Sequence, residues 1–342
     1  MMSKTARALG AAVMMLAAAC ADPTLVATPG TSNAALFDAV WSQTDLQYSM
    51  FALKHVDWDS VGRVMRPRAL AATSDAELAR LLGNMLETLR DRHVSLSTSV
   101  NATPIAYRTA SDSQPSGFNA TLIDHVYLTP ATSHSTEHLS YGLAGPGVGY
   151  VRIPSFTGSG WANELDEALT ALNDPAHLII DVRDNLGGDD ELAIALAGRF
   201  ADRRRVYGYV PVRNGPSHDD FTPEIEQAVQ PAGRHANSAV VVLTNRHVYS
   251  SAEDFVLALR ELPNVTIVGD TTGGSSGKPI TRELANGWTF TVSTWIEYDL
   301  ERRPIEDAGV APAIVVRAQP SDVSRGVDRA MNRALEMAGA AP

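Results

Sequence analysis

Three short apolar runs in the second half of the chain alternate with amphipathic segments, and this alternation constrains the fold more than any other feature. The apolar runs are residues 177–182 (HLIIDV), 239–243 (AVVVL) and 265–269 (VTIVG). The amphipathic segments, whose apolar residues recur at helical spacing, are 164–172, 191–200 and 252–262. Buried strands that alternate with helices pair mostly in parallel. We therefore predict an α/β core.

The chain before this core carries helical patterns. Leu36 and Val40 fit one face of a first helix. Ser74 and Glu77 form a capping box, S-x-x-E, which is typical of the start of a second helix. The sequence therefore predicts a small N-terminal helical domain over residues 33–98.

The first twenty residues have the pattern of an export signal. Lys4 and Arg7 precede an apolar run over residues 8–19, which is too short for a stop-transfer helix. The only cysteine of the chain, Cys20, follows this run directly. Either Cys20 is lipidated, because the segment resembles a bacterial lipobox, or the signal is removed after Ala19 and the cysteine is incidental. Both readings predict an exported protein, either periplasmic or attached to the outer membrane through a lipid anchor.

Changes in residue composition and pattern divide the chain into five regions. A polar stretch with two prolines follows the signal and is typical of a tether. The predicted regions are a lipoprotein signal (1–20), a tether (21–32), the helical domain (33–98), the catalytic core (99–320), and a C-terminal helix and tail (321–342).

Charge and motif spacing argue against several classes of ligand. The formal charge of −11 disfavours a nucleic-acid surface. The stretch HSTEH (His134–His138) matches a zinc pattern that works only on a helix, but its neighbours are Ser, Thr, Pro and Gly, which favours a polar loop. The stretch GDTTGGSSGKP lacks the phosphate-loop spacing, because Pro279 follows Lys278. We expect no metal, no cofactor and no nucleic-acid partner.

Ser250 has two readings in the stretch HVYSSAEDFVLAL. It could cap the following helix, with Glu253 completing a capping box. It could also be a nucleophile, since a helix N-terminus offers unpaired N–H groups and a partial positive charge to an oxyanion. Two other local signals are weak alone: His93 at a predicted helix end, and the Gly187-Gly188 turn after a predicted strand.

Six segments in one order give a more specific signal. They are DRHVSL (91–96), VGYVRIPSF (148–156), IIDVRDNLGG (179–188), TNRHVYSSAEDF (244–255), VGDTTGG (268–274) and IEDAGVAPAIVV (305–316). Together they resemble the motifs of the tail-specific, or C-terminal processing, family of serine peptidases. The pattern is most similar to the tricorn-like and interphotoreceptor-retinoid-binding-protein-like branch. This resemblance implies a ClpP/crotonase-like ββα core and a peptide or protein substrate.

The resemblance also implies residue roles. Ser250 matches the attacking serine, and His93 matches the histidine that acts as general base in the tricorn-like branch. Glu306 matches an acidic residue that helps to position the catalytic groups. The N–H of Ser251 and that of Gly187 or Gly188 match the oxyanion donors.

Departures from the family leave alternatives open. The processing peptidases proper use a lysine base. Here Ser275 stands at the position expected for that lysine, and Lys278 lies three residues later. A Ser250–Lys278 dyad is therefore the alternative mechanism. His247 is a further alternative base. Ala313 replaces a family aspartate, and the stretch between the first two motifs is too short for a PDZ module.

Two other functions share the fold. Retinoid-binding relatives imply a non-catalytic binding protein for an apolar ligand, although such a protein has no reason to keep serine, histidine and acid together. A crotonase-like acyl-CoA enzyme would need a cytosolic cofactor, which conflicts with the export signal. The sequence does not specify an oligomeric state.

Overall fold

The computed structural model describes residues 30–340, except 101–102, 109–114, 234–235 and 320. The signal pattern, Cys20 and most of the predicted tether lie outside the described residues, so export and lipidation stay predictions. Within the described ranges, no helix combines the length and the apolar character that a membrane crossing requires.

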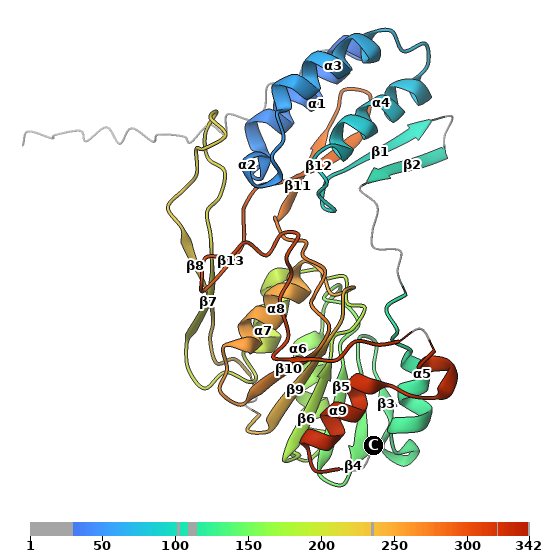
Figure 1. Cartoon of the computed structure of the whole chain (residues 1–342), viewed down its shortest axis with the longest axis vertical. Coiled ribbons are helices and arrows are strands. Elements are labelled where there is room, and N and C mark those ends of the chain that lie inside the picture. The colour runs from blue at the N-terminus through green and yellow to red at the C-terminus, as the bar shows by residue number, and fades with distance from the viewer. Residues whose placement is uncertain (1–29, 101–102, 109–114, 234–235, 320, 341–342) are drawn as a thin grey trace, which may run out of the picture.

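A seven-stranded sheet forms the centre of the lower part of the molecule (Figure 1). Its strands, in spatial order, are β14 (Ile314–Val315), β10 (Val265–Gly269), β9 (Ala239–Thr244), β6 (His177–Asp181), β5 (Val148–Arg152), β4 (Ser140–Gly145) and β3 (His134–Ser135). The strands from β14 to β5 run parallel, and β4 and β3 continue the sheet antiparallel. The three apolar runs are confirmed as the parallel strands β6, β9 and β10.

Helices cover both faces of this sheet, because its central strands are apolar on both sides. In β9, Val240 and Val242 belong to one buried cluster, whereas Val241 and Leu243 belong to the opposite one. The first cluster includes residues of α6 (Trp161–Ala171), α7 (Asp190–Ala197) and α8 (Ser251–Arg260). The second includes residues of the π-helical turn η1 (Ile123–Tyr127), which follows α5 (Ala120–Leu122), and of α9 (Arg329–Met337). The predicted α/β core is confirmed.

The N-terminal helices pack on a separate four-stranded sheet at the other end of the molecule (Figure 1). The helices are α1 (Asn33–Gln47), α2 (Phe51–Lys54), α3 (Trp58–Leu70) and α4 (Asp75–Glu87), and the strands are β11 (Pro279–Glu283), β12 (Thr289–Ser293), β1 (Ser95–Val100) and β2 (Thr103–Arg108). Leu82 and Leu86 share a buried cluster with Trp288 and Phe290, so the β11–β12 hairpin completes the core of the helical region. The domain boundary at residue 98 stays a prediction.

The predicted capping box at α4 is half formed. The hydroxyl of Ser74 accepts a hydrogen bond from the N–H of Glu77 at 3.3 Å. The carboxylate of Glu77 accepts instead from the N–H and the hydroxyl of Thr73, one residue before the cap. Both contacts satisfy donors at the helix start, which is the physical purpose of such a box.

A third sheet forms an arm along one side of the molecule (Figure 1). Its order is β13 (Tyr298–Asp299), β7 (Arg205–Val210) and β8 (Ile225–Val229). The arm reaches α1, where the Nε2 atom of His218 lies 2.7 Å from the carboxylate of Asp45. Two short 3-10 turns complete the described elements, η2 (Pro130–Thr132) and η3 (Val323–Arg325).

Candidate active site

Ser250 lies between the carboxyl end of β9 and the N-terminus of α8. Ligands of parallel α/β sheets bind outside the carboxyl ends of the strands. The backbone of Ser250 has φ 56° and ψ −136°, a conformation that residues with a side chain rarely adopt. Such strain concentrates at functional sites, where surrounding contacts hold the residue in place.

The hydroxyl of Ser250 does not cap α8. Ser250 occupies the N-cap position without a side-chain hydrogen bond to the helix, and its Oγ lies 3.1 Å from Nε2 of His93. The carboxylate of Glu253 does not reach back to Ser250 either. It accepts hydrogen bonds from the hydroxyl of Thr272 and from the N–H groups of Gly274 and Ser275. The capping-box interpretation of this stretch is therefore wrong.

Glu253 instead holds the loop that supports Ser250. Burial raises the pKa of its carboxyl to about 7, although the three donated hydrogen bonds act in the opposite direction. The loop in turn contacts the serine, because the carbonyl of Ser275 accepts the N–H of Ser250 at 2.9 Å. One buried carboxyl group thus links the first turn of α8 to the backbone around Ser250.

His93 comes from the turn between α4 and β1, 157 residues before Ser250. Its Nδ1 atom lies 2.9 Å from the carbonyl oxygen of Ser276 and 3.2 Å from the hydroxyl of Ser275. A carbonyl oxygen only accepts, so Nδ1 carries the proton and Nε2 is left to accept from the Ser250 hydroxyl. The N–H of His93 donates to Asp91 at 2.8 Å, which orients the turn.

Glu306 lies behind His93 and reaches it through a peptide group. Its Oε2 accepts the N–H of Ser276 at 2.9 Å, and the carbonyl of the same residue contacts His93. Its Oε1 lies 2.6 Å from Nζ of Lys54 in α2. Glu306 is therefore close to the serine and histidine, as the family resemblance implies, but its hydrogen bonds go to Lys54 and Ser276 and not to the imidazole ring.

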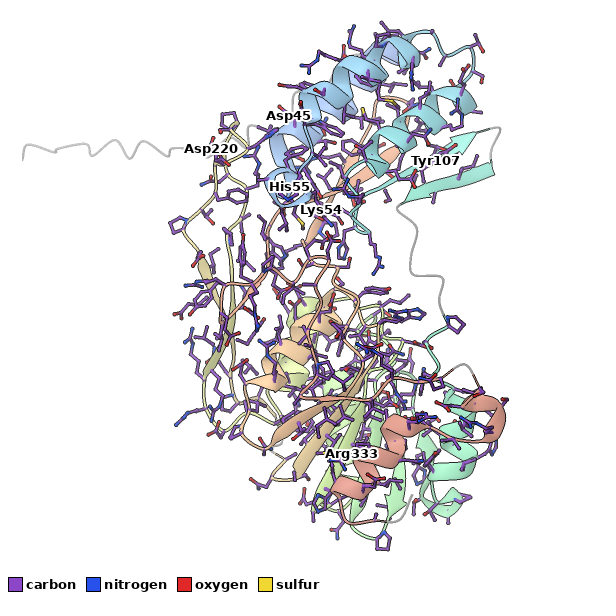
Figure 2. The ribbon with its side chains drawn as sticks, in the orientation of Figure 1. Asp45, Lys54, His55, Tyr107, Asp220 and Arg333 are labelled. Atoms are coloured by element: carbon purple, nitrogen blue, oxygen red, sulfur yellow. The ribbon has the colours of Figure 1, made fainter. Side chains whose placement is uncertain are left out.

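Lys54 comes from the N-terminal helices, and Figure 2 shows it at their lower end, above the α/β part. Its side chain is buried, and its ammonium also contacts Asp307 at 2.8 Å and the carbonyl of Arg90 at 3.1 Å. Burial opposes the charge, but Glu306 and Asp307 outweigh it and raise the pKa of Lys54. Burial, together with the charge of Asp91, raises the pKa of Glu306 despite the opposing effect of the ammonium.

The Gly187-Gly188 turn lies directly against the serine. The N–H of Gly187 donates to Oδ1 of Asn185 at 2.8 Å, and its carbonyl accepts from Phe156. Among the described residues, the N–H groups of Gly188 and Ser251 have no hydrogen-bond partner. Of the two glycines left open by the sequence, Gly188 is thus the one with a free donor.

Gly187→Ala is expected to slow reaction of Ser250 with a fluorophosphonate by about 10- to 100-fold. The glycine has φ +93°, and an added Cβ would lie 2.8 Å from the Cβ of Ser250 and from the carbonyl of Tyr249. Strain of this kind costs about 1–3 kcal/mol, which corresponds to that range of rates. The rate of labelling, followed by intact mass, measures the effect. Gly326→Ala is the control for backbone strain, because Gly326 also has a positive φ, +70°, but its added Cβ would meet nothing within 4 Å. An unchanged rate in Gly187→Ala would contradict the packing argument.

The two alternative bases make other contacts. The ammonium of Lys278 lies 3.1 Å from Asp190 and over the ring of Trp295, and its side chain is half exposed. His247 lies 3.5 Å from Asp184 through Nδ1. Among the described residues, the hydroxyl of Ser250 is hydrogen-bonded to His93 and to neither alternative base.

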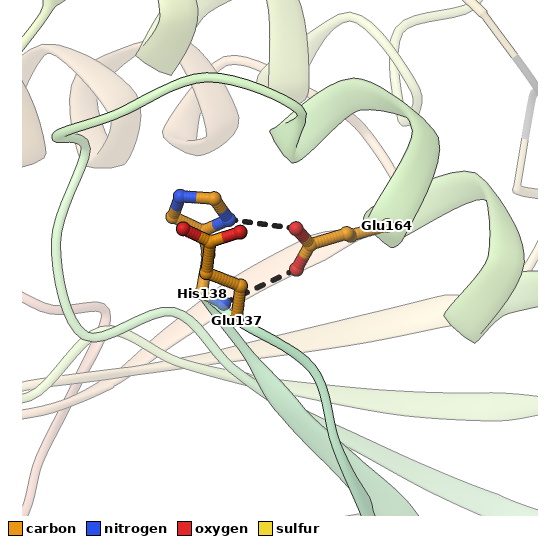
Figure 3. A group of neighbouring side chains, drawn as sticks. All are labelled: Glu137, His138 and Glu164. Carbon is orange, nitrogen blue, oxygen red and sulfur yellow. Dashed lines mark hydrogen bonds and ion pairs between the residues drawn. The ribbon is translucent and has the colours of Figure 1, made fainter.

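The HSTEH stretch is not helical. His134 lies in β3, and His138 follows in the connection to β4, so the two histidines do not share a helical face. His138 contacts Glu164 at 2.6 Å, and Glu137 lies nearby (Figure 3). Glu164 also accepts from the hydroxyl of Thr136 and the N–H of His138, so this group fastens the connection to α6.

Sequence reasoning missed several residues of the site. Lys54, Asn185 and Ser276 hold its parts together, and Asp254 and Glu297 line the cavity described below. No local pattern in the sequence marks Lys54 as part of the site. Its partner Glu306 lies 252 residues away.

Comparisons with known proteins place the chain in a family of peptidases. The sequence profile described as peptidase family S41 matches residues 147–316, and that of the tricorn protease C1 domain matches residues 29–87. Carboxy-terminal processing protease CtpA of Bacillus subtilis is 32% identical over 171 residues, which is 49% of this chain and 34% of that protein. The chain thus spans about a third of the length of this curated relative.

Solved structures extend the similarity to most of the chain. A peptidase candidate from Parabacteroides merdae is 33% identical with a TM-score of 0.80, over 90% of this chain and 97% of that one. The photosystem II D1 C-terminal processing protease has a TM-score of 0.57 at 16% identity, over 88% of this chain and 99% of that one, which shows a shared fold.

Proposed function

Because the chain belongs to peptidase family S41, we propose that it is a serine peptidase that hydrolyses peptide bonds through a Ser250 acyl-enzyme. The observation that carries the proposal is the 3.1 Å contact between Oγ of Ser250 and Nε2 of His93. A serine hydroxyl needs such a base, since it is too weakly acidic to attack a carbonyl unaided near pH 7.

The reaction proceeds in two halves. Oγ of Ser250 attacks the carbonyl carbon, and its proton passes to Nε2 of His93. The oxyanion accepts hydrogen bonds from the N–H groups of Gly188 and Ser251, and when the C–N bond breaks, His93 returns the proton to the leaving amine. Water then attacks the ester, gives a proton to His93, and the histidine protonates Ser250 as the acid leaves.

Glu306 and Lys54 are positioning residues in this scheme. They act on the imidazole through the peptide group of Ser276, whose N–H and carbonyl contact Glu306 and His93 respectively. The contact of Lys278 with Asp190 speaks for His93 rather than Lys278 as the base.

The substrate is a peptide or protein. A binding protein for an apolar ligand is the weaker reading, because the cavity beside Ser250 is lined by several ionisable side chains. Export, with a lipid on Cys20 as the only membrane attachment, rests on the pattern of residues 1–20.

The direct test is intact-mass spectrometry after exposure to a fluorophosphonate. We expect one adduct on the protein, no adduct on Ser250→Ala, and an undiminished adduct on Ser324→Ala, an exposed serine far along the chain. Peptide mapping would locate the adduct. An intact, folded protein that takes up no label, or one labelled at a serine other than Ser250, would refute the proposal.

A further inference from the structure

A cavity of about 230 Å³ opens directly beside Ser250. It is larger than the engineered cavity of about 150 Å³ that binds benzene in another protein. Its walls combine the Gly188 turn, the first turn of α8, the loop around Ser276 and the side chains of Trp295 and Glu297. Because it adjoins both the nucleophile and the free N–H groups, a substrate side chain next to the scissile bond would enter it.

The walls of this cavity contain polar atoms that lack partners. Within the described part of the chain, Oε1 of Glu297, Oγ of Ser251, Oγ of Ser276 and Nε1 of Trp295 are buried and make no hydrogen bond. Glu297 is only 2% exposed. Buried polar atoms in folded proteins are nearly always paired, and leaving them unpaired is costly. The cavity is therefore suited to a polar group rather than an apolar one.

The wall of the cavity contains several acidic side chains. Asp190 and Lys278 pair with each other at 3.1 Å near its rim. The carboxyl groups of Asp254, one helical turn after Ser250, and of Glu297 are both buried in the wall. Burial raises the pKa of both carboxyl groups, and their mutual repulsion adds to the effect for Glu297. Among the described residues, neither of these two carboxyl groups has an ion-pair partner, and a cation that entered the cavity would favour the ionised form of both.

We propose that this cavity is the subsite for a cationic substrate side chain, lysine or arginine, on the acyl side of the bond that is cleaved. The proposal rests on the peptidase function proposed above. The ammonium or guanidinium donates to the carboxyl groups of Glu297 and Asp254. An acidic side chain would add a third carboxyl group and no cation beside the two buried ones, and an apolar side chain would leave Oε1 of Glu297 buried without a partner.

Matched peptides test the preference on the unaltered protein. They differ only in the residue before the scissile bond, which is lysine, arginine, glutamate or norleucine, the last having a linear side chain without the charge. Charge-assisted hydrogen bonds support kcat/KM values about 10- to 100-fold higher for lysine and arginine than for norleucine. Equal or faster cleavage after norleucine would overturn the proposal.

Matched variants assign the preference to the carboxyl pair. Glu297→Gln keeps the shape of the side chain and should reduce the lysine-to-norleucine ratio at least about 5-fold. Glu301→Gln removes the same charge from an exposed position and should leave the ratio unchanged. Asp254→Asn gives a second measurement if Glu297→Gln does not fold. A ratio that survives both Glu297→Gln and Asp254→Asn would overturn the assignment.

An uncharged alkyl fluorophosphonate separates the two proposals, because it needs no cation in the cavity. If it labels Ser250 while lysine peptides show no advantage, the subsite proposal is wrong and the peptidase proposal stands. If Ser250 is not labelled in the folded protein, both are wrong.

Discussion

His93→Ala is expected to slow peptide hydrolysis and labelling of Ser250 by about 10²- to 10⁴-fold, with the fold intact. The imidazole, whose Nε2 lies 3.1 Å from the hydroxyl, is the proposed base, and general bases contribute rate factors of this size. His93 is partly exposed, and its side chain contacts Ser250, Ser275 and Ser276, so its removal should not collapse a core. The rate constant of fluorophosphonate labelling, followed by intact mass, measures the loss directly.

His247→Gln is the matched control, since this histidine is three residues before Ser250 in sequence but contacts Asp184. Its labelling rate should stay near that of the unaltered protein. Labelling that persists in His93→Ala and disappears in Lys278→Met would transfer the base to the lysine. A large loss in His247→Gln with little loss in His93→Ala would instead identify His247 as the base.

Lys54→Met is expected to lower the free energy of unfolding by about 3–5 kcal/mol and to slow labelling of Ser250 in the molecules that remain folded. Removing one partner leaves the carboxyl group of Glu306 buried without its counter-ion, and Lys54 is 1% and Glu306 4% exposed. The same change loosens the carboxyl group of Glu306, which accepts the N–H of Ser276. The carbonyl of Ser276 contacts His93, so the imidazole loses part of its support. Chemical denaturation measures the first effect, and labelling kinetics at a temperature where circular dichroism shows a folded protein measure the second.

A double-mutant cycle separates the ion pair from simple loss of packing. If Lys54 and Glu306 are coupled, Lys54→Met combined with Glu306→Gln should cost less than the sum of the two single changes. Arg66→Met, which breaks an exposed ion pair with Asp38, should change stability little. Additive costs, or a labelling rate that is unaffected in folded Lys54→Met, would contradict the role of Lys54 as a positioning residue.

The local structure of the core could be predicted because it has a local cause. The alternation that predicts β6, β9 and β10 reflects burial of both faces of parallel strands, and every residue of those runs contributes to the pattern. The helix start at Ser74 is predicted for the same reason, since its cap is made within one turn. Ser250 and Glu253 have the same spacing but do not form a capping box. Their side chains make tertiary contacts instead, with His93 and with the N–H of Ser275.

The same distinction between local and tertiary causes applies to the candidate active site. The sequence by itself determined the order of the motifs, the strand that leads to Ser250, and the residues that resemble a nucleophile and its base. Only the tertiary structure decided that His93 meets Ser250, that Gly188 rather than Gly187 has a free N–H, that Lys54 supports Glu306, and that Glu297 lines a cavity. These contacts join residues up to 252 positions apart, and they form only when the N-terminal helices pack against the α/β core. A hydrogen bond across that separation leaves no periodicity in the chain, because its partners are brought together by packing and not by their spacing.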